Sequence, residues 1–197
     1  MIVIFDRQHY GKPGKNDQGA GFDLDGDGRI ETQERETQLT PLYYRPAKER
    51  LEAMGHKVVI LDSGWYSDRH KRANQIALSN PGERVVYLAC HVNAGGGDYA
   101  AAIYDARSAG GKRLAEAVTA QLAGLPGIRR VRAARGTPTN GWKRGYATVK
   151  GIYAGPANIS GMCLEPYFID RPEHRFLASV QGGKLIADKL VAALLAW

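Results

Sequence analysis

Short apolar runs rich in β-branched residues alternate along this chain with segments that have the composition of helices. This alternation is typical of α/β domains, in which helices connect and cover a largely parallel sheet. We expect residues 1–197 to form a single α/β domain, with a mixed, mostly parallel sheet of about six strands flanked by helices. The expected strands are Ile2–Phe5, Lys57–Asp62, Arg84–Cys90, Tyr99–Tyr104 and Ser160–Glu165, with a further candidate within Tyr146–Tyr153.

The segment Thr32–Met54 is helical in composition but contains Pro41 and Pro46. Because an interior proline removes a backbone donor and clashes with the preceding turn, we expect a kinked helix or two short ones, ending at Gly55. Three other helices are expected from Ser67 towards Ser79, over Lys112–Leu122 and from Arg171-Pro172 to Leu195.

The net charge of +7 favours an anionic partner, such as nucleic acid, an anionic membrane surface or an acidic wall polymer. Five of the arginines lie within Arg129–Arg144, which is predicted to be an exposed loop that either contacts such a polymer or is simply solvated. No apolar run approaches the length of a membrane span. The segment at the start of the chain has no basic leader and too short an apolar run for a signal peptide, so we expect synthesis in the cytoplasm.

Three side chains that can bind or activate a metal follow or end predicted strands. His9 follows Ile2–Phe5, His91 directly follows RVVYLAC, and Glu165 ends GMCLE. In open α/β sheets, functional groups collect at the carboxyl ends of the strands. Two imidazoles and one carboxylate are a usual set of catalytic zinc ligands. Taken singly, a histidine in a chain of this length is more often a surface or core residue than a metal ligand.

Two cysteines lie close to these residues, Cys90 beside His91 and Cys163 two residues before Glu165. A cysteine–histidine hydrolase is therefore an alternative, although both cysteines fall within apolar strands, where a small buried thiol is more common. The other histidines, at positions 56, 70 and 174, are expected at the surface, the last close enough in sequence to Glu165 to line a cleft.

Four segments, in order along the chain, resemble the zinc-dependent N-acetylmuramoyl-L-alanine amidases of the Amidase_3 type, found in bacterial cell-wall hydrolases and phage endolysins. IFDRQHYGKPGKNDQGA is similar to the family's first ligand segment, and ETQLTPLYYRPAKERLEAMGHKVVIL to its glutamate-bearing helix. YLACHVNAGGG resembles its HxNA segment, and GMCLEPYFIDRPEHRFL its last block. In the same order, these segments select His9, Glu36, His91 and Glu165.

The resemblance covers nearly the whole chain and implies a function. His9, Glu36 and His91 would bind zinc, and Glu165 would be the catalytic group. Separately from the resemblance, Asn93 is a candidate substrate-binding residue, because it and the glycines after His91 leave room for glycan or peptide. The reaction implied is hydrolysis of the amide bond between N-acetylmuramic acid and L-alanine in peptidoglycan. Departures such as Tyr167, where the family has glycine, affect the expected substrate fit rather than the ligand set.

The absence of a recognisable wall-binding module makes the chain more similar to a single-domain phage endolysin than to an exported autolysin. We expect a monomer that acts on the bacterial cell wall, in phage lysis or in the periplasm, with peptidoglycan rather than nucleic acid as its partner. Two alternatives are a zinc peptidase that cuts stem-peptide bonds and a non-catalytic wall-binding module on the same scaffold.

A second metal signature runs from Asp23 to Glu34, where DLDGDGRIETQE matches the twelve-residue calcium loop of EF-hands. The expected calcium ligands are the side chains of Asp23, Asp25, Asp27 and Glu34 and the backbone carbonyl of Arg29. Glu34 and Glu36 would lie about 200° apart around one helix, so that one faces calcium and the other zinc. We expect a structural calcium ion that fixes this helix. A solvated acidic loop and a calcium-responsive interaction protein are the alternatives.

Overall fold

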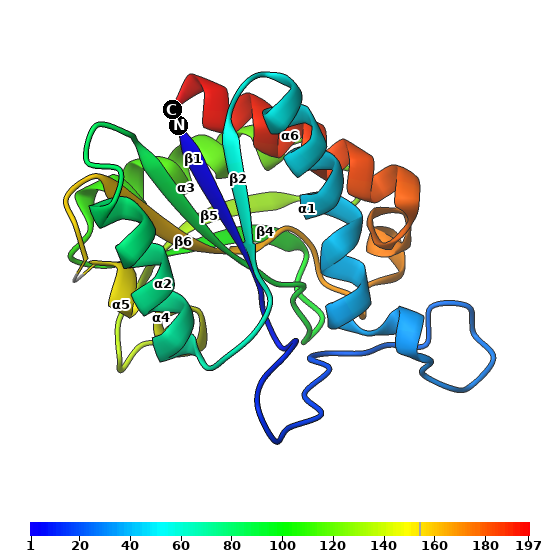
Figure 1. The fold of residues 1–197 in the computed structure, drawn as a ribbon. Helices are drawn as coiled ribbons and strands as arrows, with labels where there is room; N and C mark the ends of the chain where they lie inside the picture. The colour runs from blue at the N-terminus through cyan, green and yellow to red at the C-terminus, as the bar shows by residue number, and fades with distance from the viewer. Residues whose placement is uncertain (154) are drawn as a thin grey trace.

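In the computed structural model, which describes residues 1–153 and 155–197, a six-stranded sheet lies between two layers of helices (Figure 1). The strand order across the sheet is β2-β1-β3-β6-β4-β5. The predicted fold class is confirmed. The strands are β1 (Ile2–Arg7), β2 (Lys57–Leu61), β3 (Val85–Cys90), β4 (Tyr99–Asp105), β5 (Arg130–Gly136) and β6 (Ile159–Glu165).

Neighbouring strands are parallel throughout the sheet except at one place, where β4 runs antiparallel to β6. The carboxyl ends of β1, β2, β3 and β6 therefore meet at one edge. Every residue of β1 and of β3 is buried, because helices cover both faces of these central strands. This burial explains why their sequences read as continuous apolar runs.

Successive residues of each strand face opposite helical layers. Val3 and Phe5 pack into the core beneath α1, α3 and α6, whereas Ile2 and Ile4 face the core beneath α2, α4 and α5. The helices are α1 (Glu36–Ala53), α2 (Tyr66–Leu78), α3 (Ala109–Leu122), α4 (Lys143–Ala147), α5 (Lys150–Tyr153) and α6 (Val180–Ala196), with 3-10 helices at Thr32–Glu34 and Pro172–Ala178.

The helix α1 is continuous over 18 residues and contains both prolines, so the prediction of two short helices is wrong. Each proline frees the carbonyl four residues before it, and the tertiary structure provides a neighbour for each. The Thr37 carbonyl, freed by Pro41, accepts a hydrogen bond from Arg7 Nη2 at 2.7 Å. The Leu42 carbonyl, freed by Pro46, lies against Gly183 of α6, where a Cβ would come within 2.4 Å of the oxygen.

Two further predictions of secondary structure are wrong. The segment Arg129–Arg144 is not one exposed loop, because Arg130–Gly136 forms strand β5 at the edge of the sheet and Lys143 begins α4. Tyr146–Tyr153 is not a strand but carries the end of α4 and all of α5. The expected last helix is divided, because Ser179 ends the 3-10 helix and its hydroxyl accepts a hydrogen bond from Gly182 N at the start of α6.

Two of the histidines expected at the surface are buried. His70 Nε2 lies 2.7 Å from the Thr148 carbonyl, which fastens α2 to the turn between α4 and α5. His174 lies 3.1 Å from the Gly127 carbonyl. Both are core histidines with at least one ring nitrogen against a backbone carbonyl.

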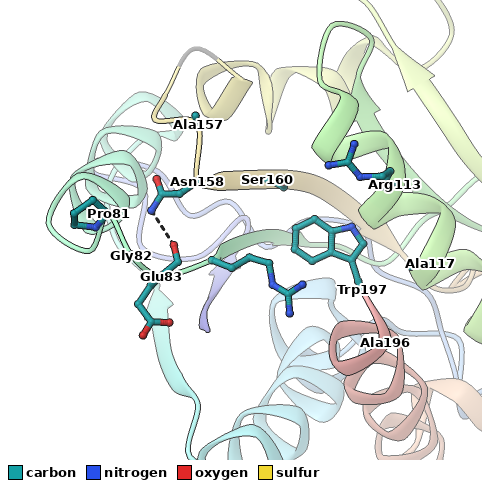
Figure 2. A pocket seen from close by; sticks show the side chains of 11 residues that line it. Pro81, Gly82, Glu83, Arg113, Ala117, Ala157, Asn158, Ser160, Ala196 and Trp197 are labelled. Carbon is teal, nitrogen blue, oxygen red and sulfur yellow. Dashed lines mark hydrogen bonds between the residues drawn. The ribbon is translucent and has the colours of Figure 1, made fainter.

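At the amino ends of β3 and β6, a hollow of about 570 Å³ opens beside the last residue of the chain (Figure 2). The Arg84 guanidinium lies 5.0 Å from the centre of the Trp197 ring. The Asn158 side-chain amide donates to three backbone carbonyls, including that of Glu83, whose carboxylate pairs with the terminal ammonium. These contacts link the segments at the amino ends of β3 and β6, on the side of the sheet opposite the carboxyl ends of β1, β2, β3 and β6. Among the described residues, no helix combines the length and apolar character needed to span a lipid bilayer.

Candidate metal centre and catalytic cleft

The carboxyl edge of the sheet brings together three residues that are far apart in sequence. His9 follows β1, His91 follows β3, and Glu36 is the first residue of α1. His9 Nε2 lies 3.4 Å from Glu36 Oε2, and His91 Nδ1 lies 2.8 Å from Glu36 Oε1. One ligand atom from each residue lies within 4.8 Å of the others. The structure therefore gathers the three residues that the sequence assigned to zinc.

His9 adopts a left-handed backbone conformation, with φ of 61°, and is the one non-glycine residue among those described that does so. A buried guanidinium holds the turn around it. Arg69 Nη1 donates to the Arg7 carbonyl at 2.6 Å, Nη2 donates to the Tyr10 carbonyl, and Nη1 also pairs with Asp6 at 2.5 Å. Because contacts on both sides of His9 fix the chain, a strained conformation persists at this position.

The ring of His9 is oriented by Asp17, a residue that the sequence analysis did not single out. Asp17 Oδ1 lies 2.9 Å from His9 Nδ1, and Lys12 Nζ lies 2.5 Å from Asp17 Oδ2. Although burial opposes its ionisation, the hydrogen bonds from Lys12, His9 and Gly19 hold the pKa of Asp17 well below its usual range. An ionised Asp17 keeps the proton of His9 on Nδ1 and leaves Nε2 free to face Glu36.

Glu36 is buried, and no lysine or arginine among the described residues pairs with it. Its carboxylate accepts hydrogen bonds from Ala20 N at 3.0 Å and Val92 N at 2.9 Å. Burial opposes the charge, yet these contacts and the two imidazoles keep the pKa of Glu36 below its usual value. The carboxylate also faces Gly19, where a Cβ would come within 2.4 Å of Oε2. The structure thus holds a carboxylate at this point with no lysine or arginine among the described residues to pair with it.

The donor set fits a divalent metal such as zinc. Two imidazoles and one carboxylate are the ligands of many catalytic zinc sites, and the fourth position is left to water or substrate. The Nε2 atom of His91 is buried and has no hydrogen-bond partner within the described part of the chain. A bound cation would balance the buried charge of Glu36, which is otherwise costly.

Glu165 ends β6 beside this cluster and is half-buried. Burial of the carboxyl group raises the pKa of Glu165 to about 6. His91 and the hydrogen bond from Asn93 oppose this increase, whereas the negative charge of Glu36 adds to it. Asn93 Nδ2 donates to Glu165 Oε2 at 2.5 Å. Asn93 therefore lies against Glu165, which makes it a residue that orients the carboxylate.

A cleft of about 480 Å³ opens over the metal cluster and Glu165. Residues of α4 form one wall and the segment after β1 forms another, while the strand ends lie at its base. Sequence reasoning did not select Tyr66 or Arg144, which also line this cleft. The full lining is His9, Ala20, Glu36, Tyr66, His91, Val92, Asn93, Ala94, Arg144, Gly145, Ala147, Thr148 and Glu165.

Both cysteines are fully buried within strands. Burial raises the pKa of the Cys90 and Cys163 thiols well above the usual value. Neither thiol lines the cleft. A cysteine nucleophile needs an accessible thiolate, so the cysteine–histidine alternative has no support in this arrangement.

The acidic loop after residue 22 folds around its own carboxylates. Asp23 accepts hydrogen bonds from Gly26 N and Gly28 N at 2.6 and 2.8 Å. Glu34 Oε1 accepts from Leu24 N at 2.5 Å. Carboxylate oxygens of Asp23, Asp25 and Asp27 lie within 4.8 Å of one another, as do those of Asp25, Glu31 and Glu34.

The expected single helix carrying both Glu34 and Glu36 is not formed. Glu34 ends a 3-10 helix, Arg35 is extended with ψ of 148°, and α1 begins at Glu36. Arg35 is extended because it forms an isolated β-bridge with Gly21. The two glutamates still face different sites, but they are separated by the extended residue Arg35 between two helices rather than by a turn of one helix.

No family profile and no curated protein sequence matches the chain. Solved structures do match. An N-acetylmuramoyl-L-alanine amidase from Clostridium difficile 630 is similar with a TM-score of 0.67 and 19% identity, over 99% of this chain and 95% of that one. The N-acetylmuramoyl-L-alanine amidase AmiC2 of Nostoc punctiforme has a TM-score of 0.64 and 20% identity, over 100% of this chain and 96% of that one. The catalytic domain of the CD27L endolysin, which targets Clostridia difficile, has a TM-score of 0.65 and 16% identity, over 100% of this chain and 97% of that one.

These likenesses span essentially the full length of both chains, so the molecule has the α/β fold of N-acetylmuramoyl-L-alanine amidases. The resemblance inferred from the sequence is confirmed at the level of the fold. At such identities the likeness defines the fold alone, and the chemistry has to be argued from the residues of the cleft.

Proposed function

We propose that this protein is a zinc-dependent N-acetylmuramoyl-L-alanine amidase that hydrolyses peptidoglycan, with His9, Glu36 and His91 as the zinc ligands. The observation that carries the proposal is the position of Glu165, a carboxylate of raised pKa beside a two-histidine, one-glutamate cluster in an open cleft. The amidase fold of the chain supports the choice of substrate.

A zinc ion bound by the three ligands would polarise the scissile carbonyl and lower the pKa of the attacking water. Glu165 would take the proton of that water on a carboxylate oxygen and transfer it to the nitrogen of L-alanine as the amide bond breaks. Asn93 would hold the Glu165 carboxylate in place through its amide donor. A pKa of about 6 suits both steps, because the group can accept and release a proton near neutral pH.

The decisive experiment is digestion of purified peptidoglycan by the zinc-loaded protein and by Glu165→Gln, with mass spectrometry of the products. We expect free stem peptides with an L-alanine amino terminus from the wild type. Glu165→Gln, which retains the shape of the side chain, should retain zinc and lose activity by about 10²- to 10⁴-fold. Cleavage within the peptide would indicate a zinc peptidase instead, and absence of products from several wall types would indicate a non-catalytic wall-binding module.

We further propose that the loop from Asp23 to Glu34 binds calcium, with Asp23, Asp25, Asp27, the carbonyl of Arg29 and Glu34 as ligands. Its role would be structural. The Glu34 carbonyl accepts a hydrogen bond from Phe22 N at 3.4 Å, and the Ala20 carbonyl accepts one from Glu36 N at 2.8 Å. The loop therefore adjoins the segment that contacts a zinc ligand.

The biological setting is a proposal of the same kind. We propose a monomeric enzyme that is made in the cytoplasm and acts on the bacterial cell wall, as a phage endolysin or in the periplasm. The net charge of +7 supports this setting, because it would keep the protein near an anionic wall.

A further inference from the structure

The cleft beside the candidate metal centre contains one side chain with a permanent positive charge. Arg144 is the one arginine or lysine among the described residues that line it. The other charged groups there are the carboxylates of Glu36 and Glu165, of which the first is committed to the metal cluster. Because a guanidinium stays ionised at every physiological pH, Arg144 gives the α4 wall of the cleft a fixed charge.

The helix that carries Arg144 is fixed tightly to the sheet. At Gly145, the next residue, a Cβ would come within 3.1 Å of the Ile103 side chain, so α4 lies directly on β4. Trp142, just before α4, packs edge-on against Tyr99, with ring centroids 6.1 Å apart. The backbone of Arg144 is therefore held at one place on the wall, and its exposed side chain can reach a ligand without moving the helix.

The guanidinium of Arg144 is also uncommitted within the described part of the chain. Neighbouring arginines form ion pairs, Arg107 with Asp105 at 2.8 Å and Arg130 with Asp98 at 2.5 Å. Arg144 has no carboxylate within pairing distance and no side-chain hydrogen bond among the described residues. An unpaired guanidinium in a substrate cleft is suited to a planar anion, with which it forms two parallel hydrogen bonds.

We propose that Arg144 binds the α-carboxylate of the second residue of the stem peptide and makes the protein selective for acidic over amidated stems. This inference rests on the proposed function. The second residue of a stem peptide, after L-alanine, is a glutamate linked onward through its side chain, so that its α-carboxyl group is either free or amidated. A carboxamide lacks the charge and one acceptor oxygen, and cannot form the bidentate pair.

The test uses two muramoyl tripeptides, N-acetylmuramoyl-L-alanyl-γ-D-glutamyl-L-lysine and the same molecule with its glutamate α-carboxyl group amidated. Binding is measured calorimetrically to the zinc-loaded Glu165→Gln protein, so that the ligands are not consumed. We expect the acid to bind about tenfold more tightly than the amide, as one charge-assisted hydrogen-bond pair allows.

Arg144→Gln in the same background should weaken binding of the acid to the level of the amide and leave the amide unchanged. Arg144→Lys should retain part of the preference, because it keeps the charge but not the planar fork. The matched control is Lys143→Gln, an exposed cation of the same helix outside the cleft lining, which should leave the ratio unchanged.

Equal binding of the two tripeptides to the parent protein, equal loss of both in Arg144→Gln, or binding of neither would overturn the inference. Hydrolysis of both tripeptides by the wild type is measured in parallel. A preference that depends on Arg144 without hydrolysis would contradict the amidase function and keep the carboxylate site. Hydrolysis of both tripeptides without a preference for the acid would support the amidase function and contradict the carboxylate site.

Discussion

The two candidate metal centres have ligands at neighbouring positions, Glu34 and Glu36, but are built in different ways. The centre at His9, Glu36 and His91 draws its ligands from three elements and holds them against the end of a buried sheet. The loop from Asp23 to Glu34 takes all its ligands from twelve consecutive residues, and its tip is exposed. The first is assembled by the fold, whereas the second is encoded locally.

This difference has an energetic consequence. A buried carboxylate such as Glu36 is costly without a cation. The ends of the sheet strands and Asp17 hold the side chains around it in place before any metal binds. The exposed carboxylates of the loop remain hydrated without an ion. Backbone amides hold them in position, as in the hydrogen bond that Gly28 N donates to Asp23. We therefore expect the proposed zinc centre to determine activity and the proposed calcium loop to modulate stability.

The largest expected effect comes from His91→Ala. Loss of one of three protein ligands should remove zinc at equilibrium and abolish hydrolysis, while the calcium-dependent shift in melting temperature persists. Zinc content by atomic absorption and peptidoglycan digestion measure the first two. His56→Ala, a histidine outside the cleft, is the control. Full zinc occupancy in His91→Ala would remove this residue from the ligand set.

A smaller effect is expected from Asp17→Asn, which removes the charge that orients His9. We expect zinc affinity to fall about 10- to 100-fold, as for other carboxylates that orient a metal-binding histidine. Competition with a chromophoric chelator measures this directly on folded protein. Asp62→Asn changes an exposed carboxylate and should leave zinc affinity unchanged. An unaltered affinity in Asp17→Asn would mean that Lys12 and Asp17 serve only the fold.

Calcium should act on stability rather than on the reaction. Saturating calcium is expected to raise the melting temperature by about 5 °C, and Glu34→Gln should remove most of that increase. Differential scanning calorimetry of zinc-loaded protein, with and without calcium, provides the comparison. Glu49→Gln, at an exposed position of α1, should keep the full increase. If calcium does not shift the wild-type transition, the loop is a solvated turn.

The smallest expected effect is a change in pH dependence. Glu165 must be ionised to accept a proton, so kcat/KM should fall as the pH drops through its pKa of about 6. Asn93→Ala removes a donor that favours the ionised form, so the acidic limb of the profile should move to higher pH. A profile that moves to lower pH or stays in place in Asn93→Ala would contradict the role of this hydrogen bond.

The sequence predicted those parts of the site that follow from the positions of strands. His9, His91 and Glu165 stand at the ends of apolar runs, and burial on both faces makes such runs easy to recognise. Strand β5 was missed because it lies at the sheet edge, where Arg130, Arg132 and Arg135 project from an otherwise unremarkable segment. Edge strands commonly carry charged side chains, so the sequence of β5 lacks the apolar pattern by which the central strands were recognised.

The residues that the sequence did not reveal act through tertiary contacts. Asp17 orients His9 across a turn of eight residues that has no regular secondary structure. Arg69 acts from α2, sixty positions from the turn that it holds. The two prolines of α1 predicted a break that the structure does not have. The Thr37 carbonyl accepts a hydrogen bond from Arg7, and the Leu42 carbonyl packs against Gly183. Such compensation has no local signature in the sequence.

The left-handed conformation of His9 places stability and chemistry in opposition at a single residue. A side chain in that conformation costs roughly 1–2 kcal/mol relative to the ordinary region, and glycine would avoid the cost. Selection for thermal resistance alone would therefore favour glycine at position 9 and eliminate the first of the proposed zinc ligands. Engineering for heat tolerance should therefore keep residue 9 fixed, because the change that most directly relieves the local strain would also remove a proposed zinc ligand and the activity expected from it.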